Sequence, residues 1–489
     1  MRGQFLKKGL PACDAPQATT KVEDETESLR NAVTNAWNVN PSNGNRNNTN
    51  TNNRYRAIPA SEFVKNCDRW LDAEAGAYRQ KHHNFEAARI HFHLVELYAL
   101  AAEVSDGRYY PRPMSTFILT YPVFREAFAP DHHDCIVHHY IAPLFTAVAE
   151  GVHYANGDIS HGNRIGHSSQ GMAERIRDDI RFISRDGRRP CFHAHRDVEG
   201  FFMHINRRKA YEMVERLSEE YYPFPDREEM LALMKVTLLS DPLEGCVRKS
   251  PISAWKCVKP NKSLFNGEPG FGLPIGKYPS QVVAGIYLSA VDAELVKIHG
   301  IRQQHFVDDY DIIAESVEKI REATDVMEKA LSALDLKLHP TKISVQPAHR
   351  GMLSCGRVVK GDRIYISNRT VKACRRSVLS YPATEAGAII AARSINSYFG
   401  LMCHCNSYKI QRRIAEEARR IFGQWLYFKT KPGHIICVVK KQYTPVAKAI
   451  AEMVELSQNL KQYETWKNHR RSHRSGGGRE WERGHKVPA

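Results

Sequence analysis

The spacing of apolar positions divides the chain into helical and strand-like stretches. Between residues 60 and 104 apolar and aromatic side chains recur at helical spacing, which predicts a helical lead-in to the fold. From 109 to 145 the β-like run STFILTYPVF is followed by a predicted helix, DCIVHHYIAPLF, and another helix is expected from Met172 to about Ile183. After Arg376 the pattern is mostly helical until about Tyr463.

The middle of the chain has a distinctive order of elements. The run CFHAHRDVEGFF predicts a strand that passes into a turn, and INRRKAYEMVERL predicts the helix after it. A turn-rich loop, a helix, the strand-like run QQHFVDDYDIIA, another helix and the strand KLHPTKISVQ follow. Strand, helix, hairpin, helix and strand form the split βαβ order of a ferredoxin-like sheet. The pattern therefore predicts an α+β fold.

Length and charge narrow the function. A chain of 489 residues is long enough for two to four subdomains. A formal net charge of +16 and a pI near 9.3 indicate a polyanionic partner, because each Lys or Arg docked on a phosphate releases counterions. Nucleic acid is the first candidate, and a basic surface that serves solubility is the alternative.

The same composition bears on where the protein works. No apolar run reaches the roughly 18 residues that a membrane span requires. The eleven cysteines are scattered and form no CxxC pair, which favours reduced thiols over a disulfide framework. We therefore expect a cytoplasmic protein without a membrane partner.

Three acids stand where nucleotidyl transfer would need them. Two metal ions about 4 Å apart must be held by carboxylates on adjacent rigid strands. FVDDYDII offers Asp308 and Asp309 within an apolar strand, with a tight turn expected at the pair, and RDVEGFF supplies Asp197 at a strand end. A DD pair alone is a weak signal, since solvated Asp pairs in turns are common. The order of the surrounding motifs makes it specific.

That order resembles reverse transcriptases over roughly Tyr109 to Arg413. The resemblance is closest to the enzymes of diversity-generating retroelements, the bacterial and phage systems that mutate a chosen gene through an error-prone DNA copy. It implies a right-hand polymerase with fingers, a ferredoxin-like palm and a helical thumb. It also implies two Mg²⁺ ions, with Mn²⁺ as a substitute, bound by Asp197, Asp308 and Asp309 with help from the Val198 carbonyl.

The resemblance gives roles to further residues. Phe202 takes the position whose aromatic ring excludes a ribose 2′-hydroxyl, and Lys342 of KLHPTK that of a catalytic cation that closes on the triphosphate. Other residues expected to contact the incoming dNTP are Arg125, Arg164, Ile275, Gly276 and Gln281. The run HRGMLSCG is similar to the turn that grips the primer, which implies that role for Gly351, Leu353 and Gly356.

The chain departs from the wider family in several places. Val123 replaces a usual Lys near Arg125, and His167 replaces the Lys of a Gly-Lys-Gly block. Both changes remove a basic contact. His195 and Arg196 precede Asp197 where apolar residues are usual, which predicts an unusually polar strand.

One loop points to the mutagenic subfamily. Most reverse transcriptases have Gln before the Gly of this loop and end it in Ser-Pro, whereas this chain has Ile275 and ends in Ser280 and Gln281. An Asn-rich stretch, in which nine of the sixteen residues 38–53 are Asn, resembles a translated template repeat. A disordered Asn-rich linker is the alternative interpretation of that stretch.

These observations predict an RNA-directed DNA polymerase that makes adenine-mutagenic cDNA from a template-repeat RNA. The expected partners are template RNA, the cDNA/RNA duplex, dNTPs and a pentameric accessory variability protein. An antiphage defence reverse transcriptase and a catalytically idle RNA-binding scaffold are the alternatives, although the intact acids and Phe202 argue against the scaffold. The expected organisation is a disordered segment (1–58), N-terminal helices and fingers (59–190), palm (191–365), helical thumb (366–463) and a basic flexible tail (464–489).

Overall fold

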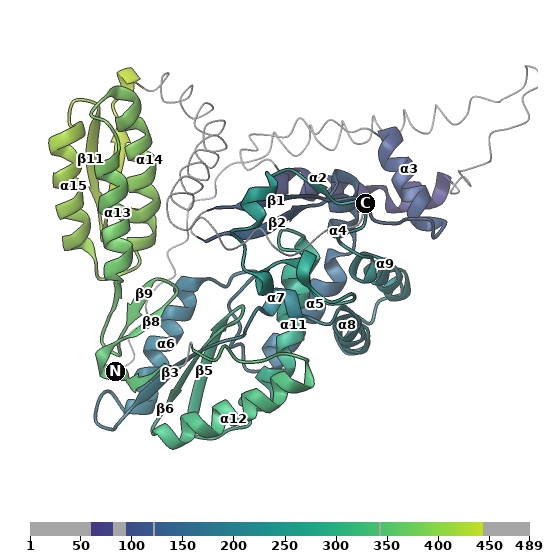
Figure 1. The fold of residues 1–489 in the computed structure, drawn as a ribbon, viewed down its shortest axis with the longest axis horizontal. Helices are drawn as coiled ribbons and strands as arrows, with labels where there is room; N and C mark the ends of the chain where they lie inside the picture. Colours follow the sequence, from purple (N-terminus) through teal and green to yellow (C-terminus); the bar gives the residue numbers. More distant parts are fainter. Residues whose placement is uncertain (1–59, 82–93, 121–122, 342–343, 444–489) are drawn as a thin grey trace, which may run out of the picture. The chain divides into compact units, whose positions relative to one another are not determined.

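The computed structural model describes residues 60–81, 94–120, 123–341 and 344–443 (Figure 1). The chain divides into two compact units, residues 1–75 with 86–109 and residues 76–85 with 110–489. The helical lead-in is confirmed by α2 (Ala60–Lys81) and α3 (Leu94–Ser105). The Asn-rich stretch, the basic tail and Lys342 lie outside the described residues.

The second unit contains a four-stranded antiparallel sheet with the strand order β5-β6-β3-β7. Its strands are β3 (Phe192–Asp197), β5 (Ile301–Phe306), β6 (Asp309–Ala314) and β7 (Ser344–Pro347). The helices α8 (Arg207–Tyr221) and α11 (Tyr278–Leu295) lie between β3 and β5 in the chain, and α12 (Val317–Ala333) lies between β6 and β7. The predicted order of strand, helix, hairpin, helix and strand is confirmed, and with it a mixed α and β fold.

Each side of the sheet packs on different helices, because successive side chains of a strand point to opposite faces. Ile313 shares a core with α6 (Ser169–Ser184), through residues such as Ile176. Its neighbours Tyr310 and Ile312 belong to the other face, where Tyr310 bonds to Asp292 of α11. Figure 1 shows α6 and α12 beside the β3, β5 and β6 strands. Because both faces are covered, the second half of strand β6, from Ile312 to Ala314, is apolar.

The remaining elements before and around this sheet are mostly helical. A small sheet combines β1 (Ser115–Leu119), β2 (Arg125–Ala129) and β4 (Val247–Arg248). The helices of this part are α4 (His132–Tyr140), α5 (Ala142–Ala155), α7 (Phe201–His204), α9 (Arg227–Leu239) and α10 (Ile252–Trp255). Two 3₁₀ turns, η1 (Pro260–Lys262) and η2 (Leu264–Asn266), lie in the turn-rich loop that was predicted before α11.

The C-terminal part corrects one prediction. After the turn η3 (Ala348–Arg350) and the sheet of β8 (Met352–Ser354), β9 (Arg357–Val359) and β10 (Ile364–Ile366), three helices follow. They are α13 (Asn368–Ser380), α14 (Glu385–Met402) and α15 (Tyr408–Phe422). The predicted helical thumb then becomes a hairpin of β11 (Leu426–Lys431) and β12 (His434–Val439), which is followed by η4 (Lys441–Tyr443). Gly433, with φ +77°, permits the hairpin turn, so this stretch is not helical.

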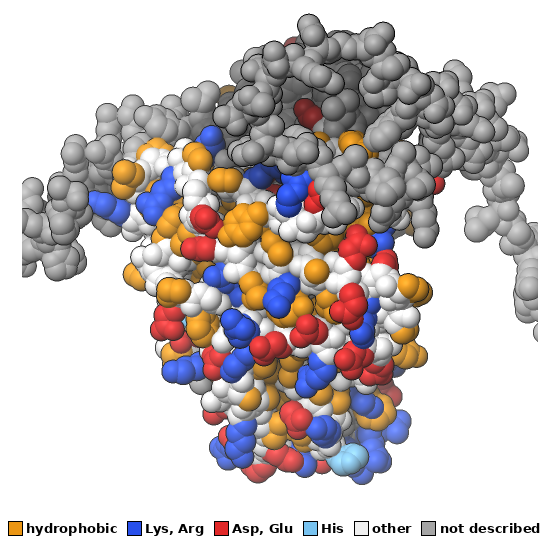
Figure 2. Space-filling view, turned by 90° about the vertical axis from the view of Figure 1, so that its right-hand side faces the viewer, with side chains coloured by type: hydrophobic (Ala, Val, Ile, Leu, Met, Phe, Trp, Pro, Cys, Tyr) orange, Lys and Arg blue, Asp and Glu red, His pale blue; other side chains and the backbone are white. Residues whose placement is uncertain are grey.

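The outer surface mixes charges of both signs on the face shown in Figure 2. Lysine, arginine and acidic side chains are interspersed among the described residues of that face. The positive excess of the chain is therefore not displayed there as one patch. Within the described part of the chain no single helix is long and apolar enough to cross a membrane, while the bent pair α4 and α5 meets the requirement in length and composition.

Candidate active site

Two acids lie at the turn between β5 and β6. The strands pair Phe306 with Asp309, so the loop between them has only two residues, Val307 and Asp308. The turn therefore lies one residue earlier than the sequence predicted. Val307 has a φ of +59°, a left-handed conformation that costs a β-branched residue on the order of 1–3 kcal/mol. The surrounding structure must hold this turn against local strain.

Strand β3 brings the third acid beside this turn. Asp197 is the last residue of β3 and stands opposite Asp309 in the antiparallel register. The Val198 N–H donates to the Asp308 carbonyl at 3.3 Å. The Asp197 side chain is buried, whereas 48% of the Asp309 side chain is exposed. The structure thus places the three predicted acids at one end of two neighbouring strands.

A histidine lies between two carboxylates on the face that carries Asp309. The Nδ1 atom of His195 is 2.9 Å from Asp311 Oδ1, and its Nε2 atom is 3.5 Å from Asp309 Oδ1. Hydrogen bonds to Asp309 and then to Asp311 raise the pKa of His195 to about 10. Burial raises the pKa of Asp311, and the imidazolium opposes that rise. The polar character predicted for the strand before Asp197 is therefore confirmed, and His195 is ion-paired with Asp309 and Asp311.

The donor set suits magnesium in its chemistry. Carboxylates and a backbone carbonyl are oxygen ligands, which Mg²⁺ prefers. As the described residues stand, no group of three His, Cys, Asp or Glu side chains is gathered closely enough to hold a metal ion. One physical reason is that the Asp309 carboxylate is directed toward His195. Metal binding at Asp197, Asp308 and Asp309 would require the Asp309 carboxylate to turn away from the imidazolium.

A buried polar network supports the turn from the opposite face of the sheet. The fully buried ring of His305 contacts the Val307 carbonyl at 2.9 Å and the Asp292 carboxylate at 3.1 Å. The Tyr310 hydroxyl donates to the other Asp292 oxygen at 2.8 Å, and its ring stacks on His305 with centroids 4.4 Å apart. These contacts connect the strained Val307 to helix α11.

Five other histidines make this part of the protein sensitive to acid. Burial lowers the pKa of His153, His161 and His193 to about 4, and it also lowers the pKa of His138 and His139. Below about pH 6.5 the unfolded chain takes up protons that these folded side chains exclude. We expect the free energy of unfolding to fall as the pH drops from about 6.5 toward 4, by up to about 1.4 kcal/mol per pH unit for each histidine. Urea unfolding at several pH values in that window measures the effect.

Two substitutions test the cause of this pH dependence. His161→Gln removes one of the five histidines with a lowered pKa, so the slope of stability against pH should fall by about a fifth. The exposed His299→Gln should leave the slope unchanged. A slope that is the same in His161→Gln and the unaltered chain would contradict the assignment.

An apolar cluster brings together two residues that were expected to contact the nucleotide. Phe202 and Ile275 both pack against a core that contains Phe128. The Phe202 carbonyl accepts a hydrogen bond from Leu273 N–H at 2.7 Å, and the Ile275 carbonyl accepts one from Phe128 N–H at 2.8 Å. Gly276 has φ +115°, and a Cβ there would collide with the Phe128 carbonyl oxygen. The loop conformation therefore requires glycine.

The other predicted nucleotide contacts are placed differently. Arg125 is exposed at the start of β2, and Gln281 is half-buried in the first turns of α11. Arg164 is only 4% exposed, and its guanidinium donates to Glu150 at 2.7 Å and to Asp158 at 2.8 Å. In this conformation Arg164 connects Glu150 and Asp158. It could contact a triphosphate only if these two ion pairs were broken.

The predicted primer grip is a tight hairpin turn. Strands β8 and β9 pair Ser354 with Arg357, which leaves Cys355 and Gly356 in the loop, both with positive φ. Leu353 is 59% exposed on β8, an unusual position for a large apolar side chain. Gly351 precedes β8 with φ +94°. The role of these residues stays a prediction, as does that of Lys342.

Sequence reasoning missed the residues that support the site. Asp311 and Asp292 are each paired with a histidine on a different element, a contact that depends on strand register and cannot be read from spacing. Lys277 is buried, its Nζ donates to the Thr237 carbonyl, and burial lowers its pKa to about 8. The only indication of Lys277 in the sequence is that it directly follows Gly276, a predicted nucleotide contact.

Comparison with known proteins gives a partial structural likeness. No protein-family model and no curated protein matches this chain. Among solved structures, apo telomerase from Candida tropicalis truncated from its C-terminal domain aligns with 52% of this chain and 56% of its own, at 11% identity and a TM-score of 0.41. Telomerase from Candida albicans with a TWJ fragment of telomeric RNA aligns over 66% and 59%, at 11% identity and a TM-score of 0.39. Apo telomerase from Candida tropicalis aligns over 63% and 56%, at 10% identity and a TM-score of 0.40.

The chain spans less than two thirds of each of these telomerase chains. A sequence identity of 10–11% and TM-scores of 0.39–0.41 do not establish a shared function.

Proposed function

We propose that this chain is an RNA-directed DNA polymerase with a two-metal-ion active site at Asp197, Asp308 and Asp309. One observation carries the proposal. The register sets Asp197 opposite Asp309, and the adjoining two-residue turn holds Asp308. Two neighbouring strands therefore end in three acids, which is the placement that a pair of metal ions requires.

Each group of residues has a distinct part in the proposed reaction. Asp197, Asp308, Asp309 and the Val198 carbonyl would hold two Mg²⁺ ions, which when bound stabilise the attacking and leaving oxygens of the displacement. The His305 and Asp292 contacts position the acid-bearing turn. Phe202 would exclude a 2′-hydroxyl from the nucleotide pocket. The net charge of +16 would favour binding of an RNA template.

Primer extension tests the proposal directly. The purified full-length chain is given an RNA template, an annealed DNA primer, dNTPs and Mg²⁺, and the products are resolved on a gel. We expect template-dependent addition of dNTPs. Extension on a DNA template but never on RNA would reject the RNA-directed activity, and the absence of any extension with either Mg²⁺ or Mn²⁺ would reject the polymerase.

The finer proposal is that synthesis is error-prone opposite template adenine, as in a diversity-generating retroelement. Ile275 supports it, because this side chain packs in the apolar cluster with Phe202 and offers no hydrogen bond to a correctly placed base pair. Polar contacts that only a correct pair can satisfy are a main source of discrimination. We also propose an accessory variability protein as a partner, which association of the two purified proteins would test.

Ile275→Gln tests the source of low fidelity. Gln adds a polar contact worth roughly 1 to 3 kcal/mol, which corresponds to about tenfold to a hundredfold in selection. We expect misincorporation opposite adenine to fall more than opposite the other three bases. Deep sequencing of cDNA copied from one RNA by both enzymes measures the change.

Ile275→Leu is the matched control, because it keeps an apolar side chain of the same volume in the cluster. Its error spectrum should equal that of the unaltered chain. If Ile275→Gln leaves the spectrum unchanged, or if the unaltered enzyme copies adenine as faithfully as guanine, the mutagenic assignment fails while the polymerase assignment stands.

A further inference from the structure

A basic hollow lies at the opposite end of β3 from Asp197. We define it by the C-terminal part of α6, the loop that follows to Phe192, residues 347–349, and the turn 360–363 between β9 and β10. Its volume is about 960 Å³. Phe192 and Asp197 are five residues apart on one strand, which separates the hollow from the acids by roughly 17 Å. The basic hollow is therefore a site distinct from the proposed active site.

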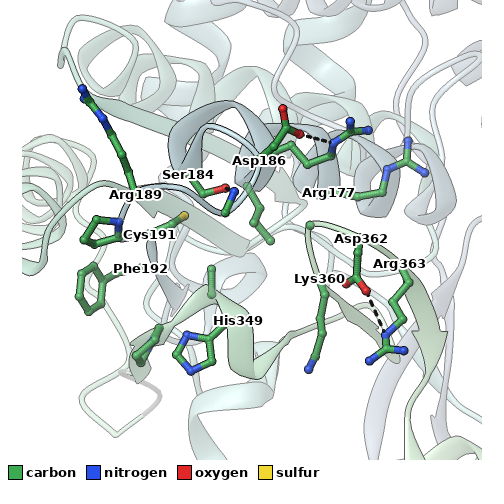
Figure 3. Close-up of a pocket in the computed structure, with 17 residues that line it drawn as sticks. Arg177, Ser184, Asp186, Arg189, Cys191, Phe192, His349, Lys360, Asp362 and Arg363 are labelled. Atoms are coloured by element: carbon green, nitrogen blue, oxygen red, sulfur yellow. Dashed lines mark hydrogen bonds and ion pairs between the residues drawn. The ribbon is translucent and has the colours of Figure 1, made fainter.

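Positive charge dominates the basic hollow. Its basic lining residues are Arg177, Arg181, Arg189, Lys360 and Arg363, against two acids, Asp186 and Asp362. Figure 3 shows that they come from separate segments, with Arg177 on the α6 side and Lys360 and Arg363 on the β9–β10 turn.

Three of the five cations are ion-paired. Arg177 pairs with Asp178 at 2.9 Å, Arg181 with Asp186 at 3.0 Å, and Arg363 with Asp362 at 3.6 Å. Arg189 and Lys360 form no ion pair with the described residues. Lys and Arg at a helix C-terminus can serve the helix dipole, which accounts for Arg181. The helix dipole does not account for Arg189 or Lys360, because neither residue belongs to α6.

The floor of the basic hollow is apolar and partly aromatic. Pro190, Pro347 and the buried Ala348 line it. Figure 3 shows Phe192 and the exposed His349 on one side of the hollow. Bases stack on such flat side chains without regard to sequence, by about 1–3 kcal/mol per base. Basic residues together with flat side chains are the combination that binds single-stranded nucleic acid.

We propose that the basic hollow binds a single-stranded segment of RNA outside the active site. A free nucleotide fits the arrangement less well, because its phosphates would need cations that converge on one point, and here they are spread over three segments. The inference rests on the proposed function only in taking RNA as the nucleic acid. A strand held here would keep part of the template RNA on the enzyme while another part is copied.

Neutralising the unpaired cations tests the proposal. Arg189→Gln with Lys360→Gln should remove two phosphate contacts, each of which contributes a slope of about 0.7 to the salt dependence of single-strand binding. We expect the slope of log K against log salt to fall by roughly 1.4, and affinity near physiological salt to fall roughly tenfold. Fluorescence anisotropy with a labelled unstructured RNA of mixed sequence measures both.

Arg321→Gln with Lys329→Gln is the matched control, because these are exposed cations on α12 and the change in net charge is the same. The control should keep the slope of the unaltered chain. If both double variants weaken binding equally, the effect is one of overall charge and the proposal is overturned.

Photo-crosslinking locates the strand without any substitution in the basic hollow. RNA that contains 4-thiouridine is irradiated on the unaltered chain, and crosslinked peptides are identified by mass spectrometry. We expect crosslinks within residues 186–192 or 347–349, and crosslinks confined to other segments would overturn the proposal. Asp308→Asn should crosslink equally, so loss of DNA synthesis and loss of this RNA site are separate outcomes.

Discussion

Asp308→Asn and, separately, Asp197→Asn should abolish RNA-templated DNA synthesis while RNA affinity stays nearly intact. Each change removes one negative charge from the place where the metal ions would bind, and a metal clamp supplies several kcal/mol of transition-state stabilisation. A loss of about 4 kcal/mol corresponds to about a thousandfold in rate. Primer extension on RNA measures synthesis, and anisotropy with the same RNA measures binding.

Asp325→Asn is the matched control for these variants, because it removes the same charge from an exposed position on α12. It should extend primers at the unaltered rate. Thermal unfolding of all three variants separates a lost site from a lost fold. Substantial synthesis by both Asp308→Asn and Asp197→Asn would remove the active-site assignment, whatever the salt dependence of RNA binding.

Phe202→Ala should admit ribonucleotides. The ring of Phe202 packs edge-on against Phe201, with centroids 5.3 Å apart, and its carbonyl is bonded to Leu273. The contact with Phe201 limits how far the ring can move, and steric exclusion is strong where a pocket cannot relax. We expect the preference for dNTP over rNTP to fall by roughly tenfold to a hundredfold. Single-nucleotide extension with each substrate gives the ratio.

Phe202→Tyr provides the control, because it keeps the ring and adds only a hydroxyl. It should retain most of the discrimination against ribonucleotides. If Phe202→Ala and Phe202→Tyr show the same ratio as the unaltered chain, another residue excludes the 2′-hydroxyl and the role inferred for Phe202 is wrong.

The sequence predicted the order of the central elements because each element carries its own local pattern. Strand β3 ends in an acid before an aromatic pair, β6 combines acids with the apolar run Ile312 to Ala314, and α12 shows a clear apolar stripe. The position of the turn was wrong by one residue for a physical reason. A β-branched residue rarely adopts a positive φ, so nothing in the local pattern marks Val307 as a turn residue.

The C-terminal hairpin shows a different limit. The stretch LYFKTKPGHIICVV alternates like a strand and contains a Pro-Gly turn signal. It is a short strand-like pattern after three helices, and Pro432 and Gly433 are the residues that indicate the turn between β11 and β12.

Pairings between distant elements could not be predicted at all. His195 meets Asp311 because β3 and β6 are in one particular register, and shifting the register by one residue would turn each side chain to the other face. The same holds for His305 and Asp292. Candidate acids can be found from motifs, but the residues that hold them require the structure.

Under the proposed function, helix α11 would connect the choice of nucleotide to the chemical step. The loop of Ile275 and Gly276 enters the helix at its first turn, and Asp292 near its last turn holds the ring of His305 beneath the acids. Eighteen helical residues form a stiff rod of roughly 27 Å. If the proposed function holds, a movement of the loop would displace the whole rod and with it the acid-bearing turn. Accuracy and speed would then be coupled, and substitutions in the loop should change both together.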